Sequence, residues 1–242
     1  MKFMRKSANS AHLRIENFEK DYLLAEQYRT LRTNLAFSKA GGGMKTYLVT
    51  SAEPRVGKST TAVNLAIVMA QQGKNVLLID GDIRKPSLHE AFQSVNRKGL
   101  TNLLTGQGQF GQMIRTTNID RLKLMTSGPV SPDPADLLSS AQMESVLEQA
   151  AQTFDQVVID SPPVLVAADA QLLADLCDGV LLVAKSRSTE IDKLCKAAEL
   201  LAKARGKLLG AVLNNQKENK IEQYYYHYGN FLTEKTKFLL KR

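Results

Sequence analysis

The sequence has no long apolar run. No stretch reaches the roughly 18 uncharged residues that a membrane-spanning helix needs, and the nearest candidate, 62–70, is interrupted by Asn64. Lys2, Arg5 and Lys6 lie near the amino terminus, but the apolar segment of a secretory leader does not follow them. We therefore expect a protein of the cytoplasm.

Cysteine is scarce, and so are the signatures of nucleic-acid binding. Cys177 and Cys195 are spaced neither as a metal site nor as a redox pair, and we expect both to be reduced thiols.

The net charge is +8, yet no recognition helix, zinc finger or RNA-binding motif accompanies it, so we expect no nucleic-acid partner. Much of the charge lies at the two chain ends. There it is either solvated or attracted to the inner membrane leaflet or to the cytoplasmic tail of a membrane protein.

What the sequence does contain is a phosphate-binding loop in a suitable setting. An apolar run at 47–50 leads into the loop 51–61, and a helical pattern follows at 61–70. Backbone N–H groups of such a loop, together with the start of the helix, form a nest for phosphate oxygens. We expect the nucleotide to be bound by Glu53, Pro54, Arg55, Val56, Gly57, Lys58, Ser59 and Thr60.

Two side chains of this loop have expected roles. Lys58 would place its charge on the β- and γ-phosphates, and Ser59 would give its hydroxyl to Mg²⁺. The loop departs from the usual pattern at Ala52, where glycine is expected, and alanine is acceptable there if its φ is negative. The alternative is an ordinary turn between a strand and a helix.

Alternating apolar strands and helical patterns predict the fold class. Strands are expected at 45–51, 75–79, 122–125, 156–160, 179–184 and 208–213, with helices between them. Residues 87–120 look irregular apart from short helices near 87–92 and 100–104. Solid apolar strands that alternate with helices indicate an α/β fold with a doubly wound, mostly parallel sheet. The expected division is a flexible lead at 1–21, one domain at 22–215 that opens with the helix 22–39, and a basic, tyrosine-rich tail at 216–242.

Three carboxylates follow expected strands. Asp80 and Asp82 come after the run 75–79, and Asp160 ends the run 156–160. Ligands bind at the carboxyl ends of the strands in such sheets. We expect Asp160 to hold Mg²⁺ with Ser59, because Mg²⁺ takes hard oxygen ligands. Of Asp80 and Asp82, we expect one to lie by the metal and the other by the attacking hydroxyl. A carboxylate beside a phenol can accept its proton.

Two further segments stand out. Glu26, Arg29 and Arg32 lie near one face of the helical pattern 22–37, which is either an exposed salt-bridged face or a subunit contact. Near the carboxyl end, four of the seven tyrosines fall within five residues. They form either an edge strand or a flexible segment that presents several phenols; these residues are Tyr224, Tyr225, Tyr226 and Tyr228.

In combination these motifs resemble those of bacterial tyrosine kinases. Segment 77–86, LLIDGDIRKP, resembles their Walker A′ motif, and segment 157–163, VVIDSPP, resembles their Walker B motif. Glu26-x-x-Arg29-x-x-Arg32 is similar to their oligomerisation motif, the loop and helix at 128–140 resemble a family segment, and the tyrosine cluster resembles their autophosphorylated tail. The likeness is to the stand-alone CpsD/CapB type of capsule and exopolysaccharide operons.

The resemblance implies a function and its parts. The chain would use ATP and Mg²⁺ to phosphorylate tyrosine, with Lys58, Asp80, Asp82 and Asp160 in the catalytic site. Asp82 and Asp160 would hold the metal with Ser59, and Asp80 would be the base. The tail tyrosines would be modified in trans within a ring that is built by Glu26, Arg29 and Arg32. The implied partners are protein substrates, a membrane-bound activator that recruits the kinase to the inner face of the membrane, and a phosphotyrosine phosphatase.

Two other functions remain open. A MinD/ParA-like ATPase switch would share the sheet and its motifs, but it carries a signature lysine where this chain has Glu53. A scaffold of polysaccharide machinery would bind nucleotide without transferring phosphate. Arg55 stands where the kinase family often has glycine, and we expect it to exclude any backbone conformation that only glycine can adopt.

Overall fold

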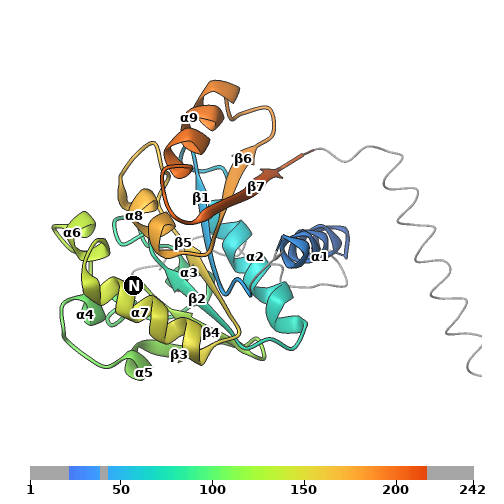
Figure 1. Cartoon of the computed structure of the whole chain (residues 1–242). Helices are drawn as coiled ribbons and strands as arrows, with labels where there is room; N and C mark the ends of the chain where they lie inside the picture. Colours follow the sequence, from blue (N-terminus) through green and yellow to red (C-terminus); the bar gives the residue numbers. More distant parts are fainter. Residues whose placement is uncertain (1–21, 39–42, 217–242) are drawn as a thin grey trace, which may run out of the picture.

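The computed structural model describes residues 22–38 and 43–216. Its seven-stranded sheet has the order β3-β4-β2-β5-β1-β6-β7 (Figure 1). Every neighbouring pair is parallel except β3 and β4, which are antiparallel. The strands are β1 (Thr46–Ser51), β2 (Val76–Asp80), β3 (Ile114–Thr116), β4 (Leu122–Met125), β5 (Gln156–Asp160), β6 (Gly179–Lys185) and β7 (Lys207–Asn214).

Nine helices are found in the described residues, and none of them is long and apolar enough to cross a membrane. They are α1 (Tyr22–Phe37), α2 (Lys58–Gln71), α3 (Leu88–Ala91), α4 (Leu100–Leu104), α5 (Phe110–Met113), α6 (Pro134–Leu138), α7 (Ala141–Thr153), α8 (Asp169–Leu176) and α9 (Ile191–Leu201). The expected doubly wound, mostly parallel sheet is confirmed. The proposed lead at 1–21 and nearly all of the tail lie outside the described residues.

One segment differs from the sequence-based expectation. Residues 87–120 were expected to be irregular apart from two short helices, which correspond to α3 and α4. That expectation was wrong for α5 and β3, which occupy 110–116. Elements of three or four residues are too short to show a hydrophobic period, and β3 is only partly buried at the sheet edge.

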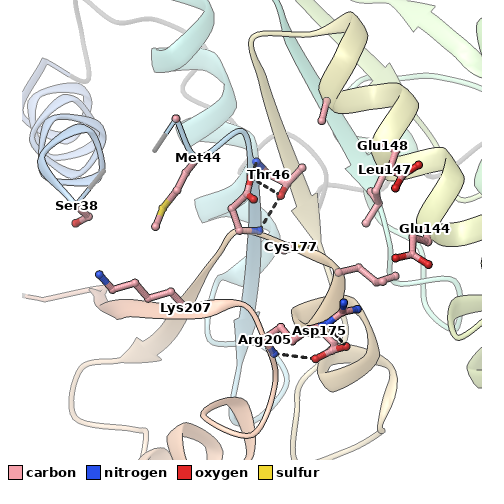
Figure 2. A pocket seen from close by; sticks show the side chains of 14 residues that line it. Ser38, Met44, Thr46, Glu144, Leu147, Glu148, Asp175, Cys177, Arg205 and Lys207 are labelled. Carbon is pink, nitrogen blue, oxygen red and sulfur yellow. Dashed lines mark hydrogen bonds and ion pairs between the residues drawn. The ribbon is translucent and has the colours of Figure 1, made fainter. Parts of the chain in front are cut away.

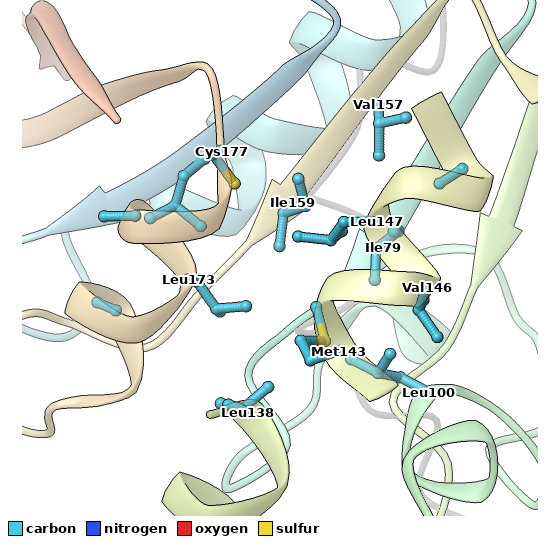
Figure 3. Packing of buried hydrophobic residues seen from close by; sticks show 14 of the residues in the cluster. Ile79, Leu100, Leu138, Met143, Val146, Leu147, Val157, Ile159, Leu173 and Cys177 are labelled. Carbon is cyan, nitrogen blue, oxygen red and sulfur yellow. The ribbon is translucent and has the colours of Figure 1, made fainter. Parts of the chain in front are cut away.

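Helices cover both faces of the sheet because its strands are apolar on both sides. On one face Ile79, Val157 and Ile159 pack against α7 and α8, as the close view of this cluster shows (Figure 3). On the other face Leu78 and Val158 pack against α2. The alternation of neighbouring residues between the two cores follows from the period of two in a strand.

Helix α1 packs on α2 outside the sheet (Figure 1). Ala25, Tyr28 and Leu35 form its buried side. Arg32 Nη1 donates to the backbone oxygen of Val68 in α2 at 2.8 Å. The helix that carries the predicted subunit contact is therefore attached to the helix that follows the phosphate loop.

A pocket of about 790 Å³ lies at the opposite end of the sheet from the phosphate loop (Figure 2). Thr46, Cys177 and Lys207 place it at the amino ends of β1, β6 and β7. Arg205 at its wall is paired with Asp175 at 2.8 Å. Since doubly wound sheets bind ligands at the carboxyl ends of their strands, we place the functional site at the other end.

Asp178, beside this pocket, fixes the start of β1 to the start of β6. Its Oδ2 accepts from the backbone N of Lys45 at 2.8 Å and from the N and Oγ1 of Thr46 at 2.9 Å each. Burial favours the neutral acid, but the hydrogen bonds from Thr46 and Lys45 outweigh it and lower the pKa of Asp178.

An ion pair fixes the loop after β2 to α8. Arg84 Nε and Nη2 donate to the two carboxylate oxygens of Asp169 at 2.7 and 2.9 Å. The side chain of Asp169 is completely buried, whereas that of Arg84 is 42% exposed. A buried carboxylate needs such a partner, because an unpaired charge in the interior is costly.

We predict that Asp178→Ala lowers the free energy of unfolding by about 1–2 kcal/mol at pH 7, a value reduced for solvent screening. Because the folded-state pKa is depressed, this stabilisation is present above the unfolded pKa of about 4 and disappears as pH falls through the folded value. Urea unfolding at pH 7 and pH 3 measures it. The exposed Asp120→Ala is the control, and an equal loss for Asp178→Ala at both pH values would contradict the prediction.

We predict that Arg84→Met destabilises the protein by about 2–3 kcal/mol, because it leaves the carboxylate of Asp169 buried and unpaired. The double variant Arg84→Met/Asp169→Asn removes that charge and should recover most of the loss. Thermal and urea unfolding give the comparison, with Lys85→Met as the neighbouring control. Additive effects of the two substitutions would show that the pair has no such role.

Candidate active site

The phosphate loop connects the end of β1 to the start of α2. Gly57, with φ 96°, caps the amino end of α2, and Thr61 N donates to Gly57 O at 2.9 Å. Because this is the first turn of the helix, the N–H groups of residues 58–60 have no intrahelical acceptor and are available to an anion. The predicted loop therefore has the geometry that phosphate binding needs.

The two departures from the usual loop sequence are accommodated differently. Ala52 is buried and does not have a positive φ, as its side chain requires. Arg55 adopts the left-handed region at φ 64°. That region is open to a residue with a side chain at a cost of about 1–2 kcal/mol. The loop therefore tolerates arginine at position 55, although glycine would adopt this backbone conformation with less strain.

The lysine of the loop contacts two of the three strand-end carboxylates. In the order β2-β5-β1, the strand that ends in Asp160 lies beside the strand that leads into the loop, and the strand that ends in Asp80 is the next one out. Lys58 Nζ lies 3.2 Å from Asp82 Oδ2 and 3.4 Å from Asp160 Oδ1. Ser59 Oγ lies 3.2 Å from Lys58 Nζ. The structure therefore brings the predicted catalytic and metal-binding residues together.

Asp80 is directed inward rather than toward solvent. It is completely buried, and its Oδ2 accepts from the backbone N of Ser87 at 3.1 Å and of Leu88 at 3.0 Å. Gly81 follows it, where a Cβ would lie 2.8 Å from the backbone oxygen of Asp160. Only glycine fits here without a shift, so the loop carrying Asp80 and Asp82 can turn directly against β5.

The electrostatics of the cluster follow from its burial. Burial, with the nearby Asp160 carboxylate, raises the pKa of Asp80 to about 8. Burial also raises the pKa of Asp160, although Lys58 and Ser59 oppose this. Burial would favour the neutral amine of Lys58, but Asp160 and Asp82 outweigh it and raise its pKa. The ammonium group of Lys58 is therefore the positive charge that offsets the carboxylates of Asp82 and Asp160.

This cluster also fits a divalent cation. Asp80 Oδ1 and Asp160 Oδ2 are buried without a hydrogen-bond partner, and buried acceptors of this kind need one. Among the described residues, no three His, Cys, Asp or Glu side chains gather as a metal cluster. Mg²⁺ is usually held by one or two carboxylates with phosphate and water oxygens, a set that does not require such a cluster.

The other predicted residues have varied surroundings. Glu53 Oε2 lies 3.4 Å from the Nζ of Lys193 in α9. Glu26 and Arg29 pair within α1. The four tail tyrosines lie outside the described residues. Two residues at the site were not predicted from the sequence. They are Asp169, the partner of Arg84, and Asn214, whose Nδ2 donates to the backbone oxygen of Val56 at 2.9 Å.

Known proteins resemble this chain in sequence and in fold. A family model described as an AAA domain matches residues 44–208. The tyrosine-protein kinase YwqD of Bacillus subtilis is 47% identical over 205 residues, which cover 85% of this chain and 86% of YwqD. The crystal structure of the chimerical protein CapA2B2 superimposes with a TM-score of 0.77 at 36% identity, covering 80% of this chain and 85% of that one.

MinD of Pyrococcus horikoshii, solved with Mg-ADP, is more distant. It has a TM-score of 0.62 at 22% identity and covers 73% of this chain and 72% of its own, a likeness that shows the fold alone. The identity and coverage shared with YwqD are sufficient to assign the family. With its phosphate loop and strand-end carboxylates in place, the chain belongs to the family of tyrosine-protein kinases that includes YwqD.

Proposed function

We propose that this protein transfers the γ-phosphate of ATP to tyrosine hydroxyls and thereby regulates capsule or exopolysaccharide synthesis and export. Its first substrates would be Tyr224, Tyr225, Tyr226 and Tyr228 of another copy. The observation that carries this proposal is the contact of Lys58 with the carboxylates of Asp82 and Asp160 beside the phosphate loop. Phosphoryl transfer depends mainly on such positioning and charge neutralisation.

The chain's own groups would divide the work. The N–H groups at the start of α2 would bind the phosphates, and Lys58 would leave its carboxylate partners to neutralise the β- and γ-oxygens. Ser59, Asp82 and Asp160 would hold Mg²⁺. Bound there, the ion would neutralise charge on the phosphates and orient them. Its presence would also replace the positive charge of Lys58 beside Asp160.

Asp80 is the proposed acceptor of the tyrosine proton. Its Oδ2 is occupied by two backbone N–H groups, while Oδ1 has no hydrogen-bond partner. Once Asp80 is ionised, its free oxygen would be the one that accepts the phenolic proton. Because Asp80 is completely buried, the loop after β2 would have to open before a tyrosine could reach its carboxylate.

Assembly would bring the tail of one copy to the site of another. We propose a ring that forms through Glu26 and Arg29 on α1, while Arg32 is engaged with α2 of its own chain. A membrane-bound activator would recruit the kinase from the cytoplasm to the inner face of the membrane through its cytoplasmic tail. Each phosphotyrosine adds nearly two negative charges, so repulsion would favour disassembly until a phosphatase removes them.

Glu53 supports the kinase over the MinD/ParA-like switch. At the position where those ATPases carry a signature lysine, this chain has a carboxylate that faces Lys193 of its own α9. A negative charge here cannot neutralise phosphate as a lysine would. The nucleotide-binding scaffold would differ from the kinase only in lacking phosphate transfer. A measurement of tyrosine phosphorylation therefore distinguishes the two.

We predict that Lys58→Met lowers tyrosine phosphorylation of segment 221–235 by about 100-fold or more, because the phosphate charge loses its neutralising partner. The protein would be isolated from its own cells with phosphatases inhibited, and the segment analysed by mass spectrometry. Lys196→Met, which removes an exposed lysine of α9, is the matched control and should leave the phosphorylation unchanged. An unmodified tail in the unaltered protein would favour the scaffold or the switch.

A further inference from the structure

Asn214 connects the last strand to the phosphate loop. It is the final residue of β7, the edge strand beside β6. Its Nδ2 donates to the backbone oxygen of Val56 at 2.9 Å, across 158 positions of sequence. This is a side-chain contact to the loop backbone from an element that supplies none of the predicted nucleotide-binding residues.

The contact is close enough to restrict the next residue of the loop. A Cβ on Gly57 would lie 2.0 Å from Nδ2 of Asn214 and 3.1 Å from its Cγ. Such a separation is far inside van der Waals contact. Gly57 is therefore required for two reasons, its φ of 96° and the space that Asn214 occupies.

The carboxamide of Asn214 is itself fixed in orientation. Its Oδ1 accepts from the backbone N of Asn215 at 2.9 Å, which leaves the NH₂ group for Val56. The backbone oxygen of Asn214 accepts from Ser186 N at 2.9 Å, so the end of β7 stays paired with β6. An oriented donor on a paired strand can hold a loop carbonyl in place.

We propose that Asn214 is a positioning residue of the nucleotide site, which holds the phosphate loop in its binding conformation through Val56. This inference rests on the proposed binding of nucleotide by that loop. The tyrosine-rich segment follows Asn214 in the sequence. Within the described residues, Asn214 is also the last residue in a strand.

The first test compares nucleotide binding by full-length variants. Asn214→Ala should weaken the binding of both ADP and ATP by about tenfold, because the loop contacts phosphates that both share. The rate of phosphate transfer at saturating ATP should change by less than about twofold. Leu213→Ala is the control, because it removes an exposed side chain of the same strand; its affinity should match that of the unaltered protein.

The second test is a double-mutant cycle with Gly57→Ala. In the unaltered background the new methyl group collides with Asn214, whereas in the Asn214→Ala background only the backbone strain remains. The double variant should therefore bind ADP more tightly, and melt higher, than the sum of the single effects predicts. Calorimetric titration with ADP and thermal unfolding measure the two quantities.

The outcomes separate this inference from the proposed function. If Asn214→Ala binds ADP as the unaltered protein does, or if the cycle is additive, Asn214 does not position the loop, and nucleotide binding itself stands. A variant that melts lower but keeps its affinity would show that Asn214 only stabilises the fold. If the unaltered full-length protein binds no ADP, both the proposed function and this inference fail.

Discussion

The structure depends on the placement of three acidic side chains at the carboxyl ends of central strands of the sheet. Asp80 and Asp160 are completely buried there, and Asp82 is nearly so. Three carboxylates this close cannot remain ionised without positive charge, and Lys58 contacts two of them. The site is thus already arranged for charge neutralisation, which is the main requirement of phosphoryl transfer.

The surrounding structure keeps this cluster in place. The loop after β2 is held by Arg84 against Asp169, and the phosphate loop is held by Asn214 through Val56. Glycine at 81 allows that first loop to pass close to β5. Each of these contacts joins segments far apart in the sequence, so the loops that carry the chemistry are supported by rigid elements rather than by their neighbours along the chain.

The sequence predicted the sheet and the central site because both have local signals. A strand, a loop with the Gly57-Lys58-Ser59 sequence and a helix occur in one stretch, and Asp80 and Asp160 each follow or end an apolar run. Asp169 and Lys193 had no such signal, because their partners are distant and any acidic or basic residue on a helix is usually solvated. Asn214 did end an apolar strand, the same pattern that identified Asp160, and could have been found in that way.

The central claim is that the cluster around Lys58 binds a nucleotide together with Mg²⁺, and its most direct test is the calorimetric titration of ADP into the full-length protein with and without Mg²⁺. The account predicts one site per chain whose affinity rises when Mg²⁺ is present, and predicts that Asp160→Asn abolishes this rise. An affinity independent of Mg²⁺ in both proteins would contradict the assignment of these carboxylates.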